Sequence, residues 1–267
     1  MVRSARSTAT RPNPHVRELE RRPREGNAAW MERAYKAIPE VQDGDWTLLV
    51  LLGGTDTTSF RLRVAQSHLR PDLLPSFWSH TLLLDYGGAG LGRARAIEVP
   101  LAQPGGREFP PRTNGIQVRP LARYDDSAEF GNCALLGIPI QAAKVLDQVE
   151  RLQSQRSTLD CLEHVVRWNA FAWGVAGTPN PLNDNYGIPS AAMLEVAFSA
   201  AGLDLTPGLE SRASCPEAIW TGARWWQAYY KERQQQTPVG AYHIGHEFKI
   251  EEPTEKSPRR RSAARRR

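Results

Sequence analysis

The chain has 267 residues, enough for one large domain with appendages, and 40% of them are hydrophobic, as in globular proteins. Three widely spaced cysteines, Cys133, Cys161 and Cys215, exclude a disulfide scaffold, lack metal-ligand spacing and favour a reducing compartment, which we expect to be the cytoplasm. The sequence shows neither a secretory signal nor an apolar run long enough to span a bilayer. It also lacks a Walker loop and a dinucleotide fingerprint, so we expect no cofactor, and with no metal-ligand spacing we expect no metal.

Positive charge is concentrated at the two ends of the chain. Residues 1–25 contain seven Arg and three Glu, and residues 251–267 contain six Arg, one Lys and three Glu, so each end carries +4. The whole chain carries +5, which leaves −3 for residues 26–250. This distribution predicts a disordered basic arm (1–25), a globular domain (26–250) and a disordered Arg-rich tail (251–267). Such ends are either only solvated or bind nucleic acid, anionic lipid or another acidic partner.

The first half of the predicted domain has strand patterns. We expect a short helix over residues 27–39, then strands over 45–52, 81–86, 93–100, 115–119 and 132–140. The segment 55–79 is interpreted as an irregular crossing or a short helix. Five or six short strands joined by Gly-rich and Pro-rich turns predict a small antiparallel sheet.

Apolar residues recur at helical spacing in the second half. Helices are predicted over 141–153 and 158–173, and a third begins at Pro189 and ends before Gly202. A fourth opens at Ser214, where Ser-Cys-Pro-Glu has the spacing of a capping box. The combination predicts an α+β fold in which the sheet packs on helices.

Ser190 lies in the first turn of the third of these helices, directly after Pro189. A hydroxyl there is close to unpaired backbone N–H groups and to the positive end of the helix dipole, which would stabilise an oxyanion. The same position also suits a serine that only caps the helix. Two readings of Ser190, nucleophile and helix cap, therefore stay open.

The order of the motifs resembles the circularly permuted papain-like enzymes, a group that includes the YiiX-like and lecithin:retinol acyltransferase-like proteins and is related to NlpC-type peptidases. The resemblance covers roughly residues 43–220 and is carried by Gly44-Asp45-Trp46, Trp78-Ser79-His80, Ala96-Ile97-Glu98, Asn114-Gly115-Ile116 and the Ser190 helix. It implies a permuted papain-like fold and a hydrolase, peptidase, amidase or acyltransferase acting on an amide, thioester or ester bond. Its substrate would be a peptide, a lipid or a ubiquitin-like tail.

The resemblance also implies roles for three residues. His80 would be the general base, Glu98 would orient its imidazole, and Ser190 would stand where the family has a cysteine nucleophile. His80 as a structural histidine and Glu98 as an exposed edge glutamate are the alternatives. Cys161 and Cys215, near predicted helix starts, are candidates for a displaced nucleophile.

The serine at the cysteine position changes the chemistry. A thiol forms a thiolate–imidazolium pair with one histidine, whereas a hydroxyl has no comparable resting anion and needs concerted proton removal. Ser190 is therefore a natural serine nucleophile, a remnant in a degenerate site or an inactivating substitution. The alternatives to an enzyme are a non-catalytic binding module that keeps the papain-like cleft and a scaffold whose Arg-rich tails bind nucleic acid.

Overall fold

A computed structural model describes residues 16–42, 46–87, 90–105, 110–175, 177–232 and 236–245. In this part of the chain, seven strands form one sheet and six α-helices pack on it, which confirms the α+β class. The strands are β1 (Val16–Glu18), β2 (Thr47–Gly54), β3 (His80–Asp85), β4 (Arg95–Glu98), β5 (Gln117–Pro120), β6 (Phe130–Ile138) and β7 (Val239–Ile244). The helices are α1 (Asn27–Lys36), α2 (Thr57–Ala65), α3 (Ala142–Ser154), α4 (Cys161–Ala172), α5 (Pro189–Ala200) and α6 (Pro216–Glu232).

The strand order is β1-β7-β6-β2-β3-β4-β5, so β1 and β5 are the two edges. All neighbours are antiparallel except β1 and β7, which run parallel. The central strand β2 is buried along its whole length, in agreement with the continuous apolar run that predicted it. The sheet is therefore mostly antiparallel, with one parallel pair at an edge.

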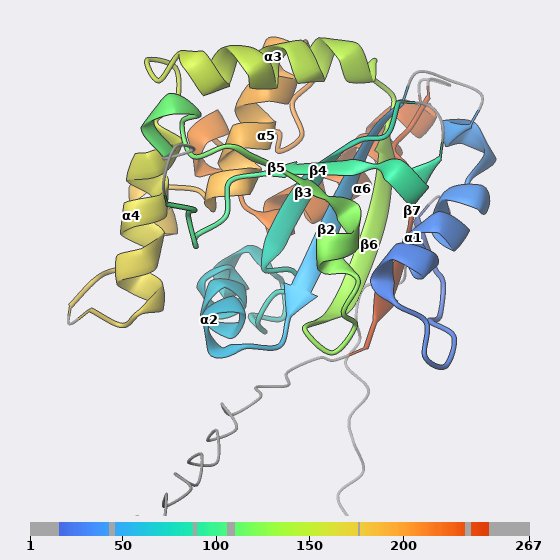
Figure 1. Ribbon diagram of the computed structural model, residues 1–267, viewed down its shortest axis with the longest axis horizontal. Helices are drawn as coiled ribbons and strands as arrows, with labels where there is room; N and C mark the ends of the chain where they lie inside the picture. The colour runs from blue at the N-terminus through green and yellow to red at the C-terminus, as the bar shows by residue number, and fades with distance from the viewer. Residues whose placement is uncertain are drawn as a thin grey trace, which may run out of the picture.

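Each face of the sheet has its own hydrophobic core. One core joins alternate strand residues, among them Leu49, Leu83 and Ile97, to side chains of α3, α4, α5 and α6. The other joins the intervening residues, among them Leu82 and Leu84, to α1. Figure 1 shows α3, α4 and α5 grouped on one side of the strands and α1 on the other. We call these the α5 face and the α1 face.

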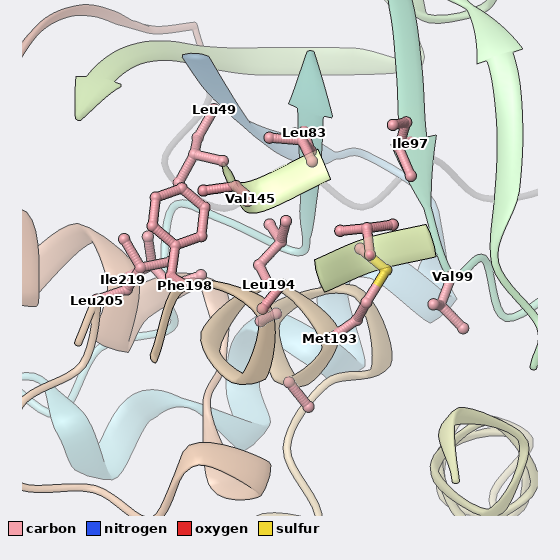
Figure 2. Close-up of a cluster of buried hydrophobic side chains, with 14 of the residues drawn as sticks. Leu49, Leu83, Ile97, Val99, Val145, Met193, Leu194, Phe198, Leu205 and Ile219 are labelled. Carbon is pink, nitrogen blue, oxygen red and sulfur yellow. The ribbon is translucent and has the colours of Figure 1, made fainter. Parts of the chain in front are cut away.

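Helix α5 is the centre of the core on its face. In Figure 2, Leu83 and Ile97 point from the strands toward Met193 and Leu194 of α5, and all four are buried. The predicted glycine stop is confirmed: Gly202 has φ +101°, and the N–H of Leu203 returns to the Phe198 carbonyl at 3.0 Å. The helix is nearly surrounded by protein along its length.

The predicted boundary of the basic arm at residue 25 is wrong. Val16–Glu18 forms β1 and pairs with β7, and Val16 is buried. Residues 19–25 then lie against α1, where Glu25 accepts hydrogen bonds from the Arg33 guanidinium at 2.6 and 2.8 Å. Composition suggested disorder because polar residues dominate, but a three-residue edge strand needs only one inward side chain. Residues 1–15 and the predicted tail 251–267 lie outside the described residues.

Two local predictions are also corrected. The predicted capping box does not form, because the Glu217 N–H donates to the Gln66 side chain at 2.8 Å instead of pairing with Ser214. The helix predicted from residue 158 begins instead at Cys161, where Asp160 caps α4 and accepts from the N–H groups of Leu162 and Glu163. In both cases a side chain with better reach satisfies the free helix N–H groups.

Candidate functional site

His80 and Glu98 form a hydrogen-bonded pair on the α1 face. His80 begins β3 opposite Leu52, and Glu98 ends β4, the next strand in the sheet. The two residues are brought together by antiparallel pairing, and His80 Nε2 lies 2.5 Å from Glu98 Oε2. The Glu98 side chain is 2% exposed, while that of His80 is 20% exposed, so solvent reaches only the imidazole.

Neighbouring groups keep the Glu98 carboxyl ionised. Burial alone would raise its pKa, but the His80 hydrogen bond, the nearby Tyr124 and the Arg119 guanidinium together hold the pKa below its ordinary value. Arg119 Nε lies 3.4 Å from Glu98 Oε1. Because an ionised carboxylate can only accept, Nε2 of His80 carries a proton, and in a neutral ring Nδ1 is left as the basic nitrogen.

Tyr124, in the helical turn directly after β5, packs against the His80–Glu98 pair. Its ring stacks on the His80 imidazole with centroids 6.2 Å apart. Burial and the charge of Glu98 raise the pKa of the Tyr124 phenol, which keeps it neutral in the working pH range. The pair is thus held in an environment that fixes its geometry and its protonation.

Ser190 makes different contacts. Its Oγ accepts a hydrogen bond from the Val99 N–H at 2.9 Å and donates one to the Val99 carbonyl at 3.2 Å. The residue is fully buried, and it lies in the first turn of α5 without capping the helix, since the N-cap is Ile188. The hydroxyl therefore links the start of α5 to Val99, the residue directly after β4. This role differs from both the nucleophile and the helix cap that the sequence suggested.

The sheet itself lies between Ser190 and the His80–Glu98 pair. Residues of β3 and β4 alternate between faces, so Leu83 and Ile97 point to the α5 face while Leu82, Leu84 and Ala96 point to the α1 face. His80 and Glu98 have the even register of the second set, and Ser190 belongs to the helix packed on the first. The structure therefore brings together two of the three expected residues and places the third on the opposite face.

The two candidate cysteines are embedded in the core. Cys161 begins α4 and Cys215 directly precedes α6, and both are completely buried. Burial raises the pKa of each thiol to about 12, so neither forms a thiolate near neutral pH. This environment is that of inert structural cysteines, and it gives no support to a displaced nucleophile.

Asn114, part of the resembled motif, has a structural role. Its backbone is left-handed, with φ 51°, and its Nδ2 donates to the carbonyls of Leu152 and Leu159 at 3.0 and 2.7 Å. Its Oδ1 accepts from the Cys161 N–H at 3.0 Å. One side chain thus ties the end of α3 to the start of α4. Gly44 and Asp45, which begin the first motif of the resemblance, lie outside the described residues.

A surface groove next to the His80–Glu98 pair was not predicted from the sequence. It has a volume of about 850 Å³ and lies between the start of α1, the turn before β4 and the edge strand β5. Its lining includes Glu32, Arg93, Arg95, Val118 and Arg119. The only sequence signal was the Gly-rich run 87–92 followed by two arginines, which fits no nucleotide motif. Arg119 connects the groove to Glu98.

Across the described ranges, no three His, Cys, Asp or Glu side chains gather in an arrangement that could bind a metal ion. Among the same residues, no helix combines the length and the hydropathy needed to cross a bilayer.

The chain was also compared with known proteins. No protein-family model matches it, and no curated protein matches it significantly.

Proposed function

We propose that the protein is a non-catalytic binding module, in which a papain-like arrangement of elements is kept and the nucleophile position has become structural. The observation that carries the proposal is the pairing of Ser190 with Val99. A serine nucleophile must give its proton to a base as it attacks, and here the hydroxyl donates to a backbone carbonyl in the buried core. Its exposed fraction of 0% also leaves no path for a substrate.

The position of the base supports the same conclusion. In a serine or cysteine hydrolase, the nucleophile lies within hydrogen-bond reach of the base, or slightly beyond it in an unliganded site. His80 is bonded to Glu98 on the α1 face, and Ser190 is bonded to Val99 from the α5 face. Bringing the two side chains together would require the edge of the sheet to rearrange. Papain-like ancestry accounts for the order of these residues, and loss of turnover accounts for their separation.

The proposal is tested by Ser190→Cys, a nearly isosteric change. We expect the introduced thiol to react with iodoacetamide at pH 6 as slowly as Cys133, Cys161 and Cys215, because it lies in the core and lacks an imidazolium partner. Site-resolved alkylation followed by mass spectrometry measures the four rates in one sample. Rapid alkylation that is slowed by His80→Ala would refute the binding-module proposal.

One observation favours a second candidate, a hydrolase or acyltransferase in which His80 and Glu98 activate water or an external acyl acceptor. The 2.5 Å pair has the geometry of the histidine and carboxylate in a catalytic triad, and the imidazole is partly exposed. A panel of p-nitrophenyl esters and peptide anilides, tested with the wild type, His80→Gln and Ser190→Ala, separates the candidates. Turnover lost in His80→Gln and kept in Ser190→Ala would favour this enzyme over the binding module.

A further inference from the structure

We propose that the groove beside β5 binds an extended acidic segment of a partner polypeptide, which adds to the edge of the sheet. The inference rests on the proposed binding function and names the ligand class and the site. Three features carry it: the arginines that line the groove, the outward backbone groups of β5, and the open glycine turn before β4.

The charge of the lining favours an anionic ligand. Arg93, Arg95 and Arg119 line the groove, with Glu32 as the acidic member. Glu32 is already occupied: it accepts from the Leu91 N–H at 3.0 Å and pairs with Lys36 at 3.2 Å. Within the described part of the chain, no carboxylate pairs with Arg93. A ligand carboxylate would therefore meet an uncompensated guanidinium.

Arg119 can also contribute. It contacts Glu98 through Nε at 3.4 Å, a long separation, and its side chain is 31% exposed. Arg95 lines the groove but pairs with Asp85, and both have the register of Leu83 and Ile97, so its guanidinium lies on the α5 face, away from the floor of the groove. Each guanidinium has five N–H donors, so a bond to one carboxylate leaves others for a ligand. The groove thus offers several donors along its length, which suits a chain with repeated carboxylates.

The backbone of β5 favours an extended polypeptide over a compact anion. Strand β5 is an edge, and the N–H of Leu121 donates to the Ala94 carbonyl at 3.1 Å. In an antiparallel pair, hydrogen-bonded positions alternate, so Arg119 faces β4 through its backbone, while the N–H and C=O of Val118 point outward. Val118 is 45% exposed. An added strand could bond to these groups, as in β-augmentation.

The turn before β4 leaves room for side chains of this strand that reach over β5. A Cβ built on Gly92 would have no atom within 4 Å, and Gly90 has φ +86°, where a side chain would be strained. The turn that leads into β4 therefore leaves its backbone open toward the groove. Leu91, Ala94 and Leu121, all buried, form an apolar floor. Polar walls over an apolar floor suit a peptide that alternates acidic and apolar residues.

The experiment uses the full-length chain and a fluorescein-labelled (Glu-Val)5 peptide as the probe, with (Gln-Val)5 as the uncharged comparison. Fluorescence anisotropy gives the dissociation constants for wild type, Arg93→Gln and Val118→Pro. We expect Arg93→Gln to weaken binding of the acidic probe roughly two- to fivefold, the range for one exposed ion pair. Val118→Pro removes only the outward N–H, a change that an edge strand tolerates, and should weaken binding roughly two- to tenfold.

Arg17→Gln is the matched control, because Arg17 is an exposed arginine on the opposite edge strand, β1. It removes the same charge and should leave the affinity unchanged. A second probe, with benzoylphenylalanine in place of the central valine, locates the bound peptide by photo-crosslinking and mass spectrometry. Crosslinks should fall in residues 90–95 and 117–122.

Two results would overturn the proposal. One is crosslinking confined to the Arg-rich ends, with equal affinities for Arg93→Gln and Arg17→Gln. The other is full displacement of the probe by inorganic tripolyphosphate together with an unchanged affinity of Val118→Pro, which would identify a simple anion site. Mass spectrometry of the recovered peptide tests the proposed function separately: an intact peptide agrees with a binding module, and a cleaved one refutes that function while leaving the groove assignment standing.

Discussion

The Ser190 hydroxyl and the backbone of Val99 form a reciprocal pair of hydrogen bonds, N–H to Oγ at 2.9 Å and Oγ–H to C=O at 3.2 Å. Val99 directly follows β4, and Ser190 is in the first turn of α5, so the pair fixes the start of the helix against the sheet. Both residues are fully buried or nearly so.

Ser190→Ala is therefore expected to destabilise the fold. The change leaves the Val99 N–H and C=O buried without partners, and each unpaired buried group costs roughly 1–3 kcal/mol. We expect a loss of about 2 kcal/mol in the free energy of unfolding, measured by urea denaturation. Ser199→Ala, a serine near the other end of the same helix, is the control and should change the free energy by less than about 0.5 kcal/mol. Equal effects of the two substitutions would contradict this role for Ser190.

The His80–Glu98 pair is expected to stabilise the fold at neutral pH. His80→Ala leaves a buried carboxylate with Arg119 as its remaining cation, so we expect a loss of about 2–3 kcal/mol at pH 7. In a double-mutant cycle with Glu98→Gln, the coupling energy should exceed about 1 kcal/mol. Because the pKa of Glu98 is lowered in the fold, the stabilisation should be present at neutral pH and disappear as the pH falls through that pKa. A coupling energy that is the same at pH 7 and pH 3 would contradict a stabilising bond between His80 and an ionised Glu98.

Glu195 should make stability depend on pH in the opposite direction. This residue of α5 is 1% exposed, and burial raises the pKa of its carboxyl from 4.5 to about 7, despite the opposing effect of Thr206. Between those two values the folded chain holds a proton that the unfolded chain has released, so the free energy of unfolding falls as the pH rises. At about 1.4 kcal/mol per pKa unit, the effect is at most about 3.5 kcal/mol.

The variant Glu195→Gln removes this proton, and its stability relative to the wild type should rise between pH 5 and pH 8. Thermal or urea unfolding at the two pH values measures the difference. Glu150→Gln, an exposed glutamate on α3, is the control and should show no such change. A relative stability of Glu195→Gln that stays constant with pH would mean that the carboxyl titrates normally.

Strand β1 gives a test of the corrected domain boundary. Val16 is 2% exposed and packs in the core on the α5 face, whereas Arg17, its neighbour, is exposed. We expect Val16→Asp to lower the free energy of unfolding by about 2–4 kcal/mol, because an unpaired carboxylate enters the core. Arg17→Asp, which introduces the same side chain one residue later, should have little effect. If the two variants unfold alike, β1 does not contribute to the fold.

Local sequence patterns determined most of the elements. The apolar run of β2, the helical spacing in α3 and α5, and the left-handed stop at Gly202 each depend on residues within a few positions of one another. The pairing of β1 with β7 could not be predicted in this way. It joins Val16 to Gly240, far apart in the chain, and a three-residue strand with one buried side chain has no period to detect.

The arrangement of the site depended on a single step of register. The residue types and the order of the motifs pointed to His80, Glu98 and Ser190. The strands predicted from the sequence put His80 and Glu98 on or beside consecutive strands. In a strand, adjacent side chains point to opposite faces, so Glu98 meets His80 on the α1 face while Val99, the next residue, meets Ser190 from the α5 face. The side of the sheet on which α5 packs is set by the buried contacts of the whole core, and only the tertiary structure decides it.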